Sequence, residues 1–198
     1  MKRVGILAGS FDPVHNGHIA FAMAAIKECR LDKVFFLVEP RPRRKQGVKA
    51  FEHRVAMVKL ATAGNPKLGS IVVNQARFSV HETLPRLISR LGNNIYMLMG
   101  DDVLAHLTNW PHVKELVEAV HIVIGTRQGN ADKTRKLGNS INSIRGLNFN
   151  FTVIETDQPG SASSYVRLQL RRGHTPKALS KKVANYIHRH KLYSPNTS

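Results

Sequence analysis

Two histidines, His15 and His18, stand in a segment whose residue types suit the binding of phosphate groups. Residues 8–18 read Ala-Gly-Ser-Phe-Asp-Pro-Val-His-Asn-Gly-His. Gly9 allows the backbone to approach a ligand closely, and Gly17 suits a turn that needs positive φ. The segment has neither the glycine-lysine pattern of P-loop enzymes nor the three-glycine dinucleotide fingerprint. It therefore indicates a polyphosphate site of another kind, to which the imidazoles contribute.

The elements around this segment are those that create an anion site in an α/β protein. The apolar run Val4–Leu7 precedes it and predicts a strand, and an Ala-rich helical pattern begins near Ile19. A strand, a glycine turn and a helix N-terminus therefore meet within residues 8–18. Unpaired backbone N–H groups and the positive end of the helix dipole both point to such a junction.

A second segment with the same character lies near the end of the chain. Ser163 and Ser164 begin a helical pattern whose first turns carry Arg167. Hydroxyls and unpaired N–H groups at the start of a helix form an anion site. The guanidinium adds a fork-shaped cation that matches phosphate.

Along the whole chain, β-rich apolar runs alternate with helical patterns. Strands are predicted at Val4–Leu7, Val34–Val38, Ser70–Val73, Ile95–Met99, His121–Gly125 and Phe151–Glu155. Helices are predicted at 17–30, 51–63, 80–91, 103–119, 162–172 and 176–190, the last capped by Thr175 and Pro176. This order predicts an α/β fold, a Rossmann-like doubly wound parallel sheet with helices on both faces. We expect a single domain over residues 1–198, with C-terminal helices at about 160–193. For the polar range 126–148, rich in Gly, Asn and Lys, a mobile excursion is one interpretation, and its order is left open.

Charge is the unusual feature of the composition. Lys and Arg number 30 against 13 Asp and Glu, which gives a formal net charge of +17 at pH 7. Such a field attracts polyanions such as nucleotides. Aromatic residues make up only 7% and are not interleaved with the basic ones, so we expect no specific nucleic-acid partner.

The remaining composition predicts a cytoplasmic protein without a membrane partner. No apolar run approaches the roughly 20 residues that span a bilayer, and the N-terminus lacks a signal-peptide pattern. Cys29 is the only cysteine, which fits a reducing compartment. It falls in the first helical pattern, where we expect it to be a packing residue.

Four motifs follow one another along the chain. They are the Gly9–His18 segment, Gly100 and Asp102 with the following Trp110, the strand end at Arg127, and Ser161–Arg167. Together they resemble the signature of the HxGH nucleotidylyltransferases, and especially of the bacterial nicotinate-nucleotide adenylyltransferases. Shorter landmarks of that family, Arg54 to Met57 and Thr83 with Leu84, also have counterparts here. The resemblance covers most of the chain.

The resemblance implies adenylyl transfer from ATP to nicotinate mononucleotide, which yields deamido-NAD and pyrophosphate in NAD biosynthesis. Catalysis is then expected from His15, His18 and Arg167, because nucleotidyl transfer needs positioning and charge neutralisation more than covalent chemistry. The ATP contacts implied are Gly9, Ser10, Phe11, His15, His18, Gly100, Asp102, Ser163, Ser164 and Arg167. Mg²⁺ is expected with ATP. No metal site of the protein itself is predicted, and a carboxylate pair at Asp101 and Asp102 stays an alternative.

The acceptor half departs from the family pattern. The acceptor contacts expected here are Ser10, Arg44, Lys45, Ser79, Trp110 and Arg127, with the Trp110 ring stacked on the pyridine. The run from Phe78 to Val80 stands where the family usually has Ser-Tyr-Thr, and the basic loop 41–45 is altered. Alternative acceptors are nicotinamide mononucleotide and phosphopantetheine, for a related adenylyltransferase or cytidylyltransferase. A noncatalytic nucleotide- or RNA-binding protein of the same fold is the alternative of another class. The oligomeric state is open, a homo-oligomer included.

Overall fold

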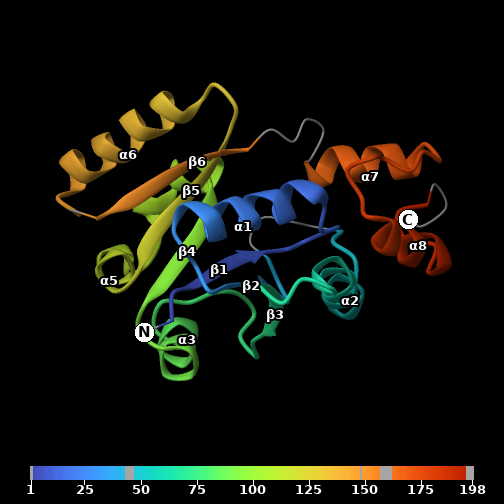
Figure 1. The fold of residues 1–198 in the computed structure, drawn as a ribbon, viewed down its shortest axis with the longest axis horizontal. Helices are drawn as coiled ribbons and strands as arrows, with labels where there is room; N and C mark the ends of the chain where they lie inside the picture. The colour runs from blue at the N-terminus through green and yellow to red at the C-terminus, as the bar shows by residue number, and fades with distance from the viewer. Residues whose placement is uncertain (1, 43–46, 148, 157–161, 195–198) are drawn as a thin grey trace.

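A parallel sheet forms the centre of the protein, whose computed structural model describes residues 2–42, 47–147, 149–156 and 162–194. Its strands are β1 (Val4–Gly9), β2 (Lys33–Val38), β3 (Leu68–Val72), β4 (Ile95–Gly100), β5 (His121–Arg127) and β6 (Phe151–Thr156). They pair in the order β3-β2-β1-β4-β5-β6, and every neighbouring pair is parallel. The predicted α/β fold is confirmed (Figure 1).

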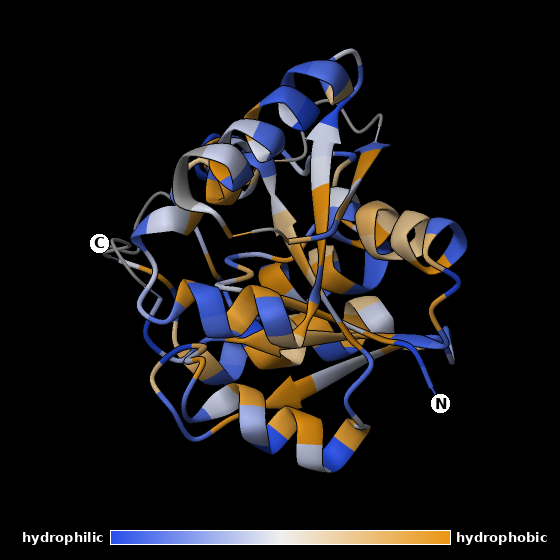
Figure 2. Cartoon of the chain, turned by 90° about the vertical axis from the view of Figure 1, so that its left-hand side faces the viewer, coloured by the Kyte–Doolittle hydropathy of each residue, from blue (hydrophilic) through white to orange (hydrophobic). Residues whose placement is uncertain are grey.

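The central strands are largely apolar because the sheet is buried on both faces there, whereas the edge strands β3 and β6 are only partly buried. Successive side chains of a strand point to opposite faces. On β1, Leu7 therefore belongs to one hydrophobic cluster and Ile6 to the other, and both are buried. Figure 2 shows the apolar strands enclosed between helices that carry hydrophilic residues.

Helices cover both faces, as a doubly wound sheet requires. One hydrophobic cluster joins the sheet to α1 (Asn16–Glu28), α2 (Phe51–Thr62), α7 (Ser163–Arg171) and α8 (Lys181–Arg189). The other joins it to α3 (Thr83–Leu91), α4 (Asp101–Leu104), the 3₁₀ helix η1 (Leu107–Asn109), α5 (Val113–Ala119) and α6 (Ala131–Arg145). Cys29 ends α1 and is buried, which confirms that it packs. Within the described ranges, none of these helices has the length and apolar character to cross a bilayer.

The range 126–148, whose order the sequence left open, is mostly helix α6 and not an irregular excursion. The segment is polar overall because only a narrow stripe of α6 side chains packs against the sheet, and the rest of the helix faces solvent. Thr134 and Ile141 are buried in that stripe. Gly138 lies between them, and a Cβ there would come within 2.5 Å of the Phe151 ring. The glycine that suggests a loop in the sequence is thus a point of close helix–strand packing.

Two other predicted helices have different limits. The range 103–119 is divided into α4, η1 and α5, because Pro111 interrupts it and His112 adopts a left-handed backbone with φ of 59°. The C-terminal helix begins at Lys181 and not near Pro176. Its cap is Ser180, whose Oγ accepts a hydrogen bond from the backbone N–H of Val183 at 3.4 Å.

Candidate active site

The candidate site lies where the strand order reverses. The chain runs from β1 outward to β2 and β3, and later returns to place β4 on the other side of β1. In open parallel sheets, ligands bind at the carboxyl ends of the strands beside such a reversal. The turn after Gly9 and the turn after Gly100 leave adjacent strands at this edge. Two of the motifs therefore lie next to each other.

The two histidines stack on each other at the start of α1. Their ring centroids are 3.7 Å apart, and the backbone N–H of His15 donates to His18 Nδ1 at 3.2 Å. This bond makes Nδ1 an acceptor, so neutral His18 carries its proton on Nε2. His18 Nε2 is then a hydrogen-bond donor without a change of charge.

His15 is the more buried of the pair, with 7% of its surface exposed. Burial lowers its pKa to about 4, so the ring is neutral at pH 7. In the described part of the chain, His15 Nδ1 is buried and has no hydrogen-bond partner. A buried polar atom of this kind is costly unless a ligand or water satisfies it.

Asp12 is the buried centre of the turn, although the expected site did not include it. Its carboxylate is 1% exposed, and Oδ1 accepts hydrogen bonds from the Tyr193 hydroxyl at 2.5 Å and the Lys49 backbone N–H at 3.2 Å. Its Oδ2 lies 3.8 Å from Arg167 Nη1. Burial, with the neighbouring Asp12 charge, raises the pKa of Tyr193 far above its usual value, so the phenol remains the donor.

The start of α7 docks on the same turn. Ser163 Oγ donates to the Pro13 carbonyl at 3.0 Å, and Arg167 Nη1 donates to the Asp12 carbonyl at 2.7 Å. The two predicted phosphate segments, about 150 residues apart along the chain, thus form one surface. Ser164 is exposed beside them at the helix start.

Arg54 is a second buried residue that the expected site did not include. Its Nη1 donates to the Ser10 and Glu39 carbonyls at 2.8 and 2.7 Å, and its Nη2 donates to the Pro40 carbonyl at 2.8 Å. Its Nε donates to the Lys49 carbonyl at 2.8 Å. One guanidinium therefore holds together the loops after β1 and β2 and the start of α2. The sequence does contain a sign that Arg54 is buried, because its spacing of three residues from Met57 places both on one face of α2.

The turn around Ser10 also depends on close packing beneath it. Phe11 has a left-handed backbone with φ of 48° and its ring is buried, 5.1 Å from the His18 ring. A Cβ on Gly9 would lie 3.3 Å from the Phe11 ring. The aromatic ring of this motif thus supports the turn and packs edge-on against a histidine.

The two carboxylates after β4 have different surroundings and do not act as a matched pair. Asp101 Oδ2 accepts a hydrogen bond from Thr126 Oγ1 at 2.7 Å, and Thr126 Oγ1 accepts one from Thr134 at 3.2 Å. Asp101 thereby ties the end of β4 to β5 and α6. Asp102 is exposed, and a Cβ on Gly100 would lie 2.5 Å from its Oδ1.

The expected acceptor residues lie on a more open part of the edge. Trp110 is half-buried, with its ring centroid 6.3 Å from that of Phe78. Ser79 is half-buried, and its Oγ accepts a hydrogen bond from the Glu82 backbone at 3.3 Å. Arg127 is exposed at the end of β5. Arg44 and Lys45 lie outside the described residues.

Known proteins resemble this chain in both sequence and fold. The cytidylyltransferase-like family model matches residues 6–169. A "probable nicotinate-nucleotide adenylyltransferase" of Clavibacter michiganensis is 34% identical over 132 residues, which are 65% of this chain and 66% of that protein. The protein of the same name from Dictyoglomus thermophilum is 30% identical and covers 96% of this chain and 99% of its own length.

The fold is also that of solved structures. The Plasmodium falciparum nicotinic acid mononucleotide adenylyltransferase complexed with NaAD has a TM-score of 0.73 at 16% identity, covering 98% of both chains. That likeness concerns the fold, whereas the Dictyoglomus thermophilum protein shares sequence over nearly the full length of both chains. The chain therefore belongs to the cytidylyltransferase-like family and, within it, to the nicotinate-nucleotide adenylyltransferases.

Proposed function

We propose that this protein transfers the adenylyl group of ATP to nicotinate mononucleotide, forming deamido-NAD and releasing pyrophosphate. One observation carries the proposal: Asp12 and Pro13 join the start of α1, with its stacked histidines, to the start of α7, with Ser163 and Arg167. A triphosphate needs donors and positive charge on more than one side. This junction offers both within a single turn.

The chemical step requires no proton from the protein. An oxygen of the acceptor phosphate, already ionised near pH 7, attacks the α-phosphorus of ATP. The bond from that phosphorus to the bridging oxygen breaks, and pyrophosphate leaves with the electron pair. His15 and His18 act as hydrogen-bond donors to oxygens that gain charge in the transition state, and Arg167 supplies a fixed cation. Donors set in place beforehand stabilise such charge most effectively.

Mg²⁺ enters as part of the substrate, bound to ATP. Magnesium prefers carboxylate and phosphate oxygens. At the turn, the Asp12 carboxylate is buried and engaged by Tyr193 and Arg167, so it is not offered to a cation. The phosphates themselves are the natural ligands here.

The acceptor binds in this proposal against Trp110, with Ser79 and Arg127 on the same edge of the sheet. A half-buried indole has a face for the pyridine ring while its other side packs on the core. Arg44 and Lys45 remain candidates for the acceptor phosphate. We further propose that the whole chain acts as one domain in the cytoplasm, which fits its single, buried thiol.

Pyrophosphate release with a panel of acceptors tests the proposal. The purified chain is given ATP and Mg²⁺ with nicotinate mononucleotide, nicotinamide mononucleotide or phosphopantetheine, and CTP replaces ATP in a parallel series. We expect the highest kcat/KM with ATP and nicotinate mononucleotide. Release with another acceptor alone would overturn the substrate assignment, and no release with any acceptor would favour the noncatalytic alternative.

A further inference from the structure

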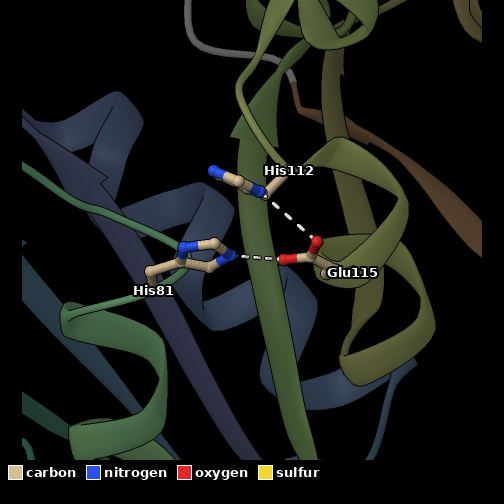
Figure 3. Close-up of side chains that lie close together, drawn as sticks. All are labelled: His81, His112 and Glu115. Atoms are coloured by element: carbon tan, nitrogen blue, oxygen red, sulfur yellow. Dashed lines mark hydrogen bonds and ion pairs between the residues drawn. The ribbon is translucent and has the colours of Figure 1, made fainter.

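Three metal-ligating side chains meet on the surface apart from the histidine turn. His81 precedes α3, His112 is the residue before α5, and Glu115 lies in the first turn of α5 (Figure 3). His81 Nε2 is 2.6 Å from Glu115 Oε2, and His112 Nδ1 is 3.3 Å from Glu115 Oε1. One potential ligand atom from each residue lies within 4.8 Å of the other two.

From this arrangement we propose that His81, His112 and Glu115 bind one divalent transition-metal ion of the Zn²⁺ type. Zinc takes imidazole nitrogen and carboxylate oxygen at about 2.0–2.2 Å, so the ligand atoms of one ion lie within roughly 4 Å of each other. The three side chains are exposed, which leaves them room to rotate toward that spacing. Three protein ligands leave a coordination position for water. The nitrogen donors disfavour Mg²⁺ and Ca²⁺, which prefer oxygen.

The backbone brings two of the ligands together before any ion arrives. His112 and Glu115 are three positions apart at a helix start, where side chains at this spacing are neighbours. The left-handed backbone of His112 turns its imidazole onto the His81 ring, with centroids 3.5 Å apart. An exposed ion pair needs only one histidine beside the carboxylate, whereas Glu115 contacts both His81 and His112.

The site would fasten two segments that already meet through the rings of Phe78 and Trp110. His81 is two residues from Ser79, and His112 is two residues from Trp110. An ion held by both histidines fastens the chain before α3 to the chain before α5. Because Trp110 is the only tryptophan, its fluorescence reports on this place alone.

Zn²⁺ binding to the tag-free full chain tests the proposal without ATP or acceptor, so it is independent of the proposed activity. Isothermal titration measures affinity and stoichiometry, and Trp110 fluorescence follows the same titration. The ligand variants are His81→Gln, His112→Asn and Glu115→Gln; asparagine tolerates the left-handed backbone. The control is His106→Gln, which removes another exposed histidine near Trp110.

We expect one equivalent of Zn²⁺ to bind the wild-type chain and the control alike, with excess Mg²⁺ present. Each ligand variant should lose at least about tenfold in affinity, since even partners of metal ligands contribute that much. Co²⁺ should give visible absorption bands in the wild type that the variants lack. Circular dichroism without metal checks that each variant folds. No saturable Zn²⁺ binding by the wild type, or unchanged affinity in the folded ligand variants, overturns the proposal.

Discussion

The two halves of the candidate site are built differently. On the side of α1 and α7, the turn around Asp12 is buried and crossed by hydrogen bonds from Arg167, Tyr193 and the Lys49 backbone. On the side expected to bind the acceptor, Trp110 is half-buried and Arg127 is exposed. The first half suits a fixed charge pattern such as a triphosphate. Two departures from the family pattern, the run from Phe78 to Val80 and the basic loop 41–45, belong to the second half, although Phe78 and Val80 are themselves buried in the core.

The largest expected effect is a loss of catalytic rate from a change in the rigid half, which is the turn around Asp12 with the starts of α1 and α7. His18→Ala should lower kcat by on the order of 10²–10⁴, because a donor set in place for the transition state is lost. The lost bond from the His15 backbone should cost only about 1 kcal/mol of unfolding free energy. Steady-state kinetics and urea unfolding measure the two effects, with His106→Ala as the control. Wild-type kcat in His18→Ala would remove the catalytic role.

Arg54→Leu tests whether the buried guanidinium holds the loops after β1 and β2 in place. Four carbonyls lose their donor, and we expect a loss of about 3 kcal/mol or more of unfolding free energy. Urea unfolding measures it, and Arg86→Leu at an exposed position of α3 is the control. Equal stability of the two variants would show that Arg54 does not hold the loops together.

Acid should weaken the rigid half through His15. Its pKa of about 4 in the folded state lies below the value of about 6.5 in the unfolded chain. The unfolded state therefore binds more protons as pH falls from about 6.5 to 4, and this group removes up to roughly 3 kcal/mol of stability over that window. Urea unfolding across this pH range should show a shallower decline for His15→Asn than for the wild type. Parallel declines would contradict the assignment.

The smallest effect is expected on the open half. Trp110→Ala should raise the KM for nicotinate mononucleotide about tenfold, the scale of one lost ring-stacking contact, while the KM for ATP stays the same. Trp110→Phe should recover part of the affinity, because it keeps an aromatic face. Initial-rate kinetics with each substrate varied distinguish the outcomes. Equal increases in both KM values, or a large loss of stability, would instead assign Trp110 to the core.

Much of the fold is readable from local patterns. The predicted centres of the strands agree with the structure because apolar residues dominate them, most strongly in the central strands, where both faces are buried. Helix α6 was not predicted from the sequence. Its buried stripe includes Thr134, Gly138 and Ile141, of which only Ile141 is strongly apolar, so the composition of the segment gives little sign of a buried face. The start of α8 after Ser180 was not predicted, because Thr175 followed by Pro176 is an equally good local pattern for the start of a helix.

By itself, the sequence determined the sheet and the family, and it predicts phosphate binding at the two segments Gly9–His18 and Ser163–Arg167. These properties are encoded in residues close together along the chain. Only the tertiary structure decided that Asp12 is held by Tyr193 and Arg167, and that His81 meets His112 and Glu115. Those contacts join residues 31 to 181 positions apart. Their partners are chosen by how helices and loops pack on the sheet, which no local pattern specifies.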